Sequence, residues 1–401
     1  MKNWKSLFLV LLFANFAISA CGKGQKLPAP TGDTETPAQV TAVEEVEKSL
    51  VDGCDGGGSL SGAKNAFAAD DFKDANRQAR CVFNDSVKSD PNNSNTEAAF
   101  IAFLSSIALG VESPQFQFVF DVNVSANTVF GTGGDPDNLA TQLAAKFTGN
   151  GMALIRNFFK FHEDKGHSID DVVGKAMEFF TENFDDWHVL LKAMATDPKF
   201  VNAKIPAGFV DNSSDLPFTF TEASYFLVWA DGLRLVGKIY PFYNLGITNS
   251  DSFADANTLV QDLNADPRFL SLRGDANGAG LIPYADLLLS SFARGAGNIR
   301  NRAPESWIVG GNFFGEILPK DSDGQAALGI TVSQLKDSLA GRLVFLSVSK
   351  SQFGIDLKKM FSNLPNSATV GEVPFKVSGS DADFREEWLK EIVRPFTVLR
   401  E

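Results

Sequence analysis

Residue types that often act in catalysis or metal binding are scarce in this sequence. Its 401 residues include only 3 Cys, 3 His and 4 Tyr. It has no Cys-x-x-Cys pair, no Gly-x-Ser-x-Gly nucleophile elbow and no phosphate loop ending in Gly-Lys-Ser/Thr. These absences remove the signatures of common redox, hydrolase and nucleotide-binding enzymes. We therefore expect a protein that is not an enzyme and that has no catalytic residues, cofactor or metal, although enzymes without such motifs exist.

The sequence also has fewer basic than acidic residues, and its N-terminal apolar stretch is short. The chain has 36 Lys and Arg against 49 Asp and Glu, a formal net charge of −13, which excludes the basic stripe typical of nucleic-acid-binding proteins. The N-terminal apolar stretch, from Leu7 to Ile18, is shorter than the about 20 residues that a membrane-spanning helix needs. Lys2 and Lys5 precede this stretch and small residues close it, which is the layout of a secretory signal peptide over residues 1–20.

The stretch ends in Ile18, Ser19, Ala20 and Cys21, which resembles the lipobox of bacterial lipoproteins. The resemblance implies that the peptide before Cys21 is removed and that this cysteine carries acyl chains such as palmitate, so that the protein is held to a membrane by its N-terminal lipid. Each buried methylene is worth about 0.8 kcal/mol, and several chains give a firm anchor. Gly22, where an Asp would favour the inner membrane, implies the outer membrane, on a face that the sequence leaves open. The alternative is an ordinary secreted protein cleaved after Ala20.

The other two cysteines, Cys54 and Cys81, form the expected disulfide. An exported chain folds in an oxidising compartment, where cysteine pairs are normally bridged. A bridge between them would close a loop of about 28 residues and stabilise the fold by about 3.5 kcal/mol in the chain-entropy model. Two free thiols are the alternative.

Composition divides the mature chain into a tether and a folded part. Residues 21–43 are polar and rich in Pro, Thr and Gly, so they cannot bury enough apolar surface to order themselves. Residues 44–113 have helical periodicity and predict an N-terminal helical module, and residues 114–401 predict a mainly helical body with short strands. The 36 Phe can fill a large core, and with only 4 Tyr in the chain few phenolic hydroxyls need a partner there. The expected fold class is mainly α, a repeat-like helical body with a few short β-strands, and α+β is the alternative.

One helical pair resembles a known repeat. Ala79, Phe83, Ser86 and Pro91 have the spacing of the second helix of a tetratricopeptide repeat. The resemblance covers a single hairpin around residues 61–110, and plain helix packing explains the same spacing.

A second repeat is internal to the chain. Residues 190–201, LLKAMATDPKFV, match residues 259–270, LVQDLNADPRFL, at seven positions. In each copy a helix should stop at Asp-Pro, because proline disfavours helix in the residue before it. Long helices should follow at residues 222–240 and 282–301, which suggests stacked helical units, although Asp-Pro is also a common turn dipeptide.

Strands are predicted at three places. Residues 115–124, QFQFVFDVNV, alternate apolar and polar residues with a period of two, which favours a half-buried strand. Residues 342–349 and 373–379 predict two more strands, and a last helix is expected over residues 381–396.

Three motifs with titratable residues allow a functional and a structural interpretation. In HEDKGH, His162 and His167 are five residues apart, so on a helix their rings would point away from each other, and a charged surface loop is the favoured interpretation over a metal site. In FDDWH, Asp185 could orient His188 as a general base, but a helix N-cap at Asp185 is favoured. Polar residues of the helix at 222–240, including Asp231, predict a narrow solvated stripe on an otherwise apolar helix.

The expected function is a scaffold or protein-binding module of the bacterial cell envelope, held to the membrane by lipid and bound to an envelope protein partner. The alternative is a carrier of a small apolar or lipid ligand, which the Phe-rich helices would suit.

Overall fold

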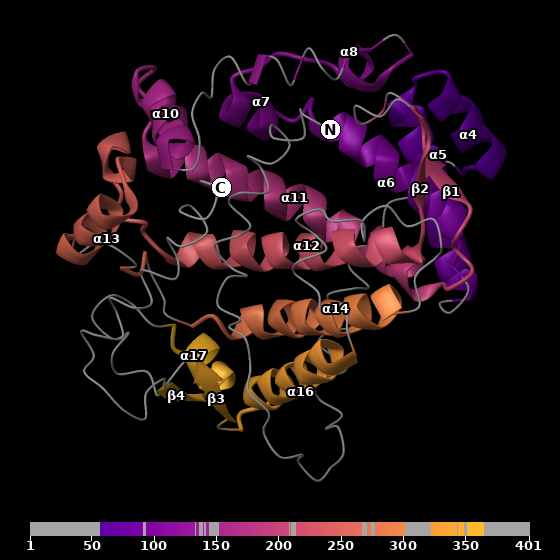
Figure 1. Cartoon of the computed structure of the whole chain (residues 1–401). Coiled ribbons are helices and arrows are strands. Elements are labelled where there is room, and N and C mark those ends of the chain that lie inside the picture. Colours follow the sequence, from indigo (N-terminus) through magenta and orange to yellow (C-terminus); the bar gives the residue numbers. More distant parts are fainter. Residues whose placement is uncertain are drawn as a thin grey trace.

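The computed structural model describes residues 57–364, except for gaps at 91–93, 133, 136–138, 140–141, 144–151, 208, 210–213, 267–270, 274–276, 301–321, 343 and 349–350. The predicted signal peptide, Cys21, the tether, Cys54, the strand at 373–379 and the last helix lie outside these residues. Within them the fold is mainly α with a few short strands, as the sequence predicts (Figure 1).

Three helices begin the described part: α4 (Leu60–Ala68), α5 (Phe72–Ser89) and α6 (Thr96–Gly110). Each begins after a side chain that accepts a hydrogen bond from a backbone amide of its first turn: Ser59, Asp71 and Asn95. α5 and α6 pack against each other as the predicted helical hairpin, with Ala79 and Phe83 buried. The tetratricopeptide resemblance itself stays a prediction.

The predicted strand at residues 115–124 is wrong, because α7 (Pro114–Phe120) is a helix there. Ser113 caps its N-terminus and Pro114 occupies the first turn, where a missing amide hydrogen costs nothing. Phe116 and Phe120 lie one helical turn apart and are both buried. An alternating pattern of phenylalanines therefore also places two of them four residues apart, on one face of a helix. Pro114, at the first position, favours the helix over the strand.

Among the described residues, α8 (Ala126–Phe130) and α10 (Met152–Glu163) follow in the upper part of the molecule in Figure 1 and lead to α11 (Ile169–Thr196). α11 has 28 residues and begins with a capping box, in which Ser168 and Asp171 each satisfy a backbone amide of the other. It ends at Thr196, immediately before the first Asp-Pro, as predicted.

A short hairpin of β1 (Ala203–Ile205) and β2 (Leu216–Phe218) carries the chain from α11 into α12 (Phe220–Ile239). α12 begins with a second capping box, between Thr219 and Glu222. It packs along α11 on one side and along α14 (Ile282–Arg300) on the other. The two long helices predicted at 222–240 and 282–301 are therefore confirmed.

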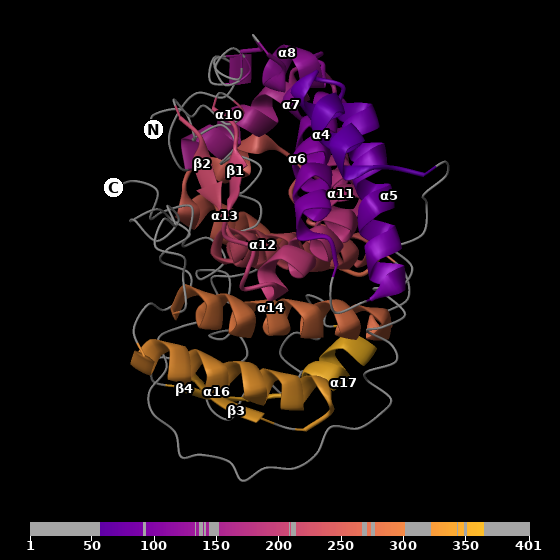
Figure 2. The same ribbon diagram turned by 90° about the vertical axis from the view of Figure 1, so that its right-hand side faces the viewer.

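Of the remaining described elements, η2 (Ser250–Phe253) packs against α10 and α13 (Ala256–Ala265) packs against η2. The others lie toward the lower end of the molecule in Figure 1 or lead into it: η1 (Tyr240–Phe242), η3 (Ala279–Leu281), α16 (Ser322–Leu339), β3 (Val344–Val348), β4 (Ser351–Ile355) and α17 (Leu357–Ser362). β3 confirms the strand predicted at 342–349 and pairs with β4 in an antiparallel hairpin. α11, α12, α14 and α16 follow one another as successive layers, which Figure 2 shows from the side.

α13 ends at Ala265, before the second Asp-Pro, which confirms the predicted helix end. However, α13 packs chiefly against η2 and lies at the edge of the molecule in Figure 1, whereas α11 lies in the core and packs against α12, α6 and α7. The two halves of the internal repeat therefore share a helix end and not an equivalent position in the core.

One hydrophobic cluster joins the first described helices to the stack. It includes Ala63 of α4, Phe103 of α6, Phe180 of α11 and Leu233 of α12. The predicted boundary at residue 113 therefore lies inside a continuous core. A smaller cluster, with Tyr243, Leu281 and Leu339 among its members, fills the space around α14, α16 and α17.

Candidate functional site

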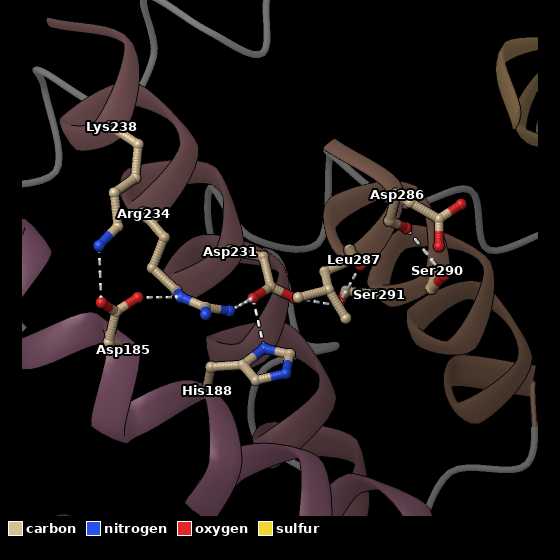
Figure 3. A network of polar contacts seen from close by, with 9 residues as sticks. All are labelled: Asp185, His188, Asp231, Arg234, Lys238, Asp286, Leu287, Ser290 and Ser291. Atoms are coloured by element: carbon tan, nitrogen blue, oxygen red, sulfur yellow. Dashed lines mark hydrogen bonds and ion pairs between the residues drawn. The ribbon is translucent and has the colours of Figure 1, made fainter. Parts of the chain in front are cut away.

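A chain of charged and polar side chains crosses the interface between α11, α12 and α14 (Figure 3). α12 contributes three of them at intervals of three and four residues, which places them on one face of the helix. We call the set the buried network, and it consists of Asp185 and His188 of α11, Asp231, Arg234 and Lys238 of α12, and Ser291 of α14.

Asp231 lies at the centre of the buried network. Its Oδ1 is 2.5 Å from Nδ1 of His188 and accepts a hydrogen bond from Nη1 of Arg234 at 3.0 Å. Its Oδ2 accepts a hydrogen bond from the hydroxyl of Ser291. One carboxylate therefore links all three helices.

The outer end of the buried network is Asp185. Its Oδ1 accepts a hydrogen bond from Nε of Arg234 at 2.8 Å, and its Oδ2 accepts one from Nζ of Lys238 at 2.8 Å. The Tyr284 ring lies 5.1 Å from the Arg234 guanidinium and 5.3 Å from the Lys238 ammonium, close enough for cation–π attraction. Side-chain exposure rises from 0% at Asp231 to 18% at Asp185 and 25% at Lys238, so the network runs from the core to the surface.

The charges within the buried network compensate one another. Two carboxylates face two cations, with the imidazole of His188 beside them. Burial by itself raises the pKa of Asp231. Three neighbours outweigh this effect and hold the pKa below its ordinary value: His188 through its charge and its hydrogen bond, Arg234 through its charge, and Ser291 through its hydroxyl. Asp231 is therefore an ionised carboxylate in the core at neutral pH.

The residue types of a hydrolase triad are present, but their connections are different. In a Ser-His-Asp triad the imidazole accepts the serine proton. Here Ser291 and His188 both bind the same carboxylate of Asp231. All three residues are also at most 3% exposed, so a substrate could not reach the hydroxyl. This arrangement can orient and neutralise its own members, and it fixes how three helices meet.

An open surface pocket of about 450 Å³ is the second candidate site. It lies where the α4–α5 turn, the end of α6 and the start of α8 meet, and its charged lining is Asp70, Asp71, Lys73 and Glu112. The three carboxylates already accept hydrogen bonds from the backbone amides of Thr132, Asp74 and Ala126, respectively. Asp71 and Glu112 bind the first turns of α5 and α8, and Asp70 binds the loop that follows α8, which gives all three a structural role.

The HEDKGH motif is folded only partly as predicted. His162 is 1% exposed, and the Nδ1 atoms of His162 and His167 are only 3.3 Å apart. Gly166, with φ +83°, ends α10 in a Schellman turn: its amide binds the Glu163 carbonyl, and the His167 amide binds the His162 carbonyl. The predicted charged loop between two helices is confirmed for residues 164–166, which form an exposed turn between α10 and α11. The expectation that the two rings point apart is wrong, because the helix stops before the second histidine and the turn brings His167 back to the buried His162.

The FDDWH prediction is also wrong. Asp185 is not an N-cap, since α11 continues through it without a break. Asp186 accepts a hydrogen bond from Arg80 of α5 at 2.9 Å, and His188 is buried against Asp231.

The polar stripe of α12 is buried and not solvated as predicted. Ser224, Asp231 and Arg234 are at most 1% exposed, and only Lys238 reaches the surface. Ser291 of α14 was missed, because the serine pair Ser290-Ser291 in a mostly apolar helix gives no pattern that predicts a buried contact. The other members of the buried network do leave a signal in the sequence. Charged residues occur in two predicted helices that are rich in apolar residues, and such charges need partners if both helices are buried.

Cys81 forms a disulfide, and the partner cysteine lies outside the described residues. The chain from Gly57 onward runs along α5, where Arg77 donates a hydrogen bond to the Gly57 carbonyl at 3.0 Å. A Cβ added at Gly58 would lie 2.8 Å from Cβ of Cys81. The segment that follows Cys54 therefore passes directly beside Cys81, and the pairing of these two cysteines stays a prediction.

Comparison with protein-family models, with curated proteins and with solved structures finds no match to this chain. In the part of the chain that the structure describes, no three His, Cys, Asp or Glu side chains form a group that could hold a metal ion. No single helix there is long and apolar enough to cross a membrane, and only α6 and α7 taken together, bent by 51°, meet the length and composition.

Proposed function

We propose that this chain is a lipid-anchored protein of the bacterial outer membrane whose helical body serves as a scaffold or protein-binding module for an envelope protein. The observation that carries the proposal is the sequence Ile18-Ser19-Ala20-Cys21 at the end of a signal-peptide pattern. The polar tether that follows is long enough to hold the body away from the lipid surface, since about 20 extended residues span about 70 Å.

The packing of the aromatic residues favours a scaffold over a carrier of apolar ligands. A carrier needs a cavity of several hundred Å³ lined mainly by apolar side chains. In the body, Phe103 instead packs against Trp187, Phe218 and Phe226, with ring centroids 5.5, 5.9 and 6.1 Å apart. Among the described residues, the space around Phe103 is therefore filled by other rings. Four of the residues that line the surface pocket carry charges, namely Asp70, Asp71, Lys73 and Glu112.

The anchor is tested by the variant Cys21→Ser expressed in a Gram-negative host. We expect the wild-type chain to incorporate a clickable palmitate analogue and to fractionate with the outer membrane, and the variant to do neither. Cys81→Ser is the matched control, because it removes a cysteine without touching the lipobox and should keep both properties. Soluble wild-type protein without label would overturn the lipoprotein proposal.

The scaffold is tested by chemical cross-linking in cells followed by affinity capture of the wild-type chain and of Cys21→Ser. A protein partner recovered reproducibly with the wild-type chain and lost with the variant supports a membrane-localised scaffold. Native mass spectrometry of the gently purified protein tests the carrier: a bound lipid or small molecule at stoichiometric amount, with no protein partner captured, would replace the scaffold by a carrier.

A further inference from the structure

The end of α10 holds two histidines in direct contact. Nδ1 of His162 and Nδ1 of His167 are 3.3 Å apart, and Nε2 of His162 is 2.9 Å from the backbone carbonyl of Val119 in α7. His162 is buried among aromatic rings, with the centroids of Phe158, Phe161 and Phe118 at 5.0, 5.4 and 6.0 Å.

The carbonyl of Val119 fixes the positions of the protons. A carbonyl oxygen only accepts hydrogen bonds, so Nε2 of His162 carries a hydrogen and donates it. Nδ1 of neutral His162 is then a bare acceptor, and the contact at 3.3 Å requires that Nδ1 of His167 carries the hydrogen. Nε2 of His167 keeps a free lone pair.

This arrangement can accept one further proton but not two. The first proton can bind Nε2 of His167 and leaves the hydrogen bond between the rings intact. A second proton must bind Nδ1 of His162, and two N–H groups then face each other across the 3.3 Å contact, each on a cationic ring. The contact cannot persist in the doubly protonated state.

We propose that His162 and His167 form a proton-operated latch, which holds the α10–α11 turn against α7 until both imidazoles are protonated and then releases the turn. The moving part is His167 with Lys165 and Gly166. The ring of His167 also packs against Phe118 of α7, with centroids 4.6 Å apart, so release uncovers that phenylalanine. The inference concerns the folded body and does not depend on the lipid anchor.

Two other charges also join the turn to α7: Lys165 and Asp121, the C-cap of α7, pair with each other at 2.6 Å and act on His162 in opposite directions. Both side chains of this pair are more than a third exposed, so the pair contributes little stability compared with the buried contact of the two histidines. Glu163 is turned toward η2, where it accepts a hydrogen bond from the Ser250 amide. Burial, followed by the charge of His167, lowers the pKa of His162, while the bond to Val119 opposes the shift. The opening therefore occurs below the ordinary pKa of histidine, which is about 6.5.

The chain has only 3 His, which makes the latch directly measurable. The full chain, labelled with ¹⁵N-histidine and purified in detergent micelles, is titrated by NMR of the imidazole nitrogens, and the signals are assigned with the variants. In His167→Gln, the amide can present either its NH₂ or its carbonyl oxygen to His162, so neither protonation state of His162 is excluded. We expect His162 to titrate at a higher pH in this variant than in the wild-type chain.

Hydrogen exchange of the turn amides distinguishes a turn that opens from a change in the pKa of His162 that leaves the turn closed. The amides of Gly166 and His167 bind carbonyls at the end of α10. In the wild-type chain their protection, corrected for the intrinsic pH dependence of exchange, should fall as His162 takes up its proton, while the amides of α4 stay protected. In His167→Gln, turn protection should persist through the same pH range. Asp251→Asn, which breaks a surface pair of α10 with Arg156, is the matched control and should behave as the wild type.

Two results would overturn the latch. One is a titration of His162 that is the same in the wild-type chain and in His167→Gln. The other is turn protection that stays constant while His162 becomes protonated in the wild-type chain, a measurement that needs no variant to fold.

Discussion

Asp231 shows how one residue can determine the packing of three helices. It is fully buried, it is ionised, and its two oxygens bind groups from α11, α12 and α14. A buried charge is tolerated only when it is paired and hydrogen-bonded. Any shift of the three helices against one another would leave this carboxylate or Arg234 without its partners, so the network specifies one arrangement.

We expect Asp231→Asn to lower the free energy of unfolding by about 3–5 kcal/mol, as when one partner of a buried ion pair is removed. The amide keeps the shape of the side chain but cannot neutralise Arg234. Urea unfolding at neutral pH measures the loss. Asp251→Asn is the control, because its pair with Arg156 is at the surface and should leave the denaturation midpoint unchanged. Equal midpoints for the two variants would contradict the structural role of the network.

Asp231 also predicts a pH dependence of stability. Its pKa is lower in the folded protein than in the unfolded chain, where it is about 3.9. Above that pH the carboxylate is ionised in both states and its contribution is fully present. As the pH falls below about 3.9, the unfolded chain takes up the proton first, so stability is lost until the folded-state pKa is passed. Urea unfolding of wild type and Asp231→Asn across this range should show a shallower acid loss in the variant. Parallel curves would show that Asp231 is not the titrating group.

Among the elements, proline and glycine explain the helix ends, and apolar alternation was misleading in one segment. The helix ends at both Asp-Pro dipeptides are where the sequence predicts them. In α7 the alternation of phenylalanines favoured a strand, and Ser113 and Pro114 outweighed it. In HEDKGH the helical angle between the two histidines was irrelevant, since Gly166 ends the helix between them.

The contact between α11 and α12 depends on one glycine. A Cβ at Gly237 of α12 would lie 2.6 Å from Oγ1 of Thr181 and 3.2 Å from the Met177 carbonyl of α11. We expect Gly237→Ala to lower the free energy of unfolding by about 1–3 kcal/mol, as overpacking does, although alanine is the better helix former. Thermal unfolding followed by circular dichroism measures the change.

Gly174→Ala on α11 is the matched control for that substitution. A Cβ there meets only the side chain of Tyr240, at an ordinary 3.7 Å. The variant should be as stable as the wild type or more stable by up to about 1 kcal/mol, from helix propensity alone. A stabilising Gly237→Ala would show that the two helices are further apart than the structure has them.

At the scale of the whole molecule, the core is continuous from α4 to α14. Phe103 of α6 contacts Trp187 of α11, Phe218 of β2 and Phe226 of α12, so the first helices share their packing with the stack. The chain segments on the two sides of residue 113 should therefore unfold together.

We expect Phe103→Ala to lower the free energy of unfolding by about 3–5 kcal/mol, through lost burial and the cavity that remains. Tryptophan fluorescence and far-ultraviolet circular dichroism should give one coincident transition in both the wild type and the variant. Val201→Ala, at a side chain that is 38% exposed, should change stability little. Two separate transitions would mean that α4–α6 form an independent unit.

The fold class, the long helices α12 and α14, the strand β3 and the helix ends at Asp-Pro could all be predicted from the sequence. These features follow from local patterns, namely a 3.6-residue apolar period and the inability of proline to continue a helix. The predicted signal peptide and the resemblance to a lipobox are likewise local patterns, and the proposed function rests on them.

Which polar residues meet depends on the packing of the helices. His188, Asp231 and Ser291 lie on three helices and up to 103 residues apart (188 to 291), and no local pattern encodes their contact. The same holds for the contact of His162 with Val119, which sets the proton positions in the proposed latch. Helix periodicity shows which face of a helix is apolar, whereas a buried charge is stable only where another helix supplies its partner, and that depends on how the helices pack.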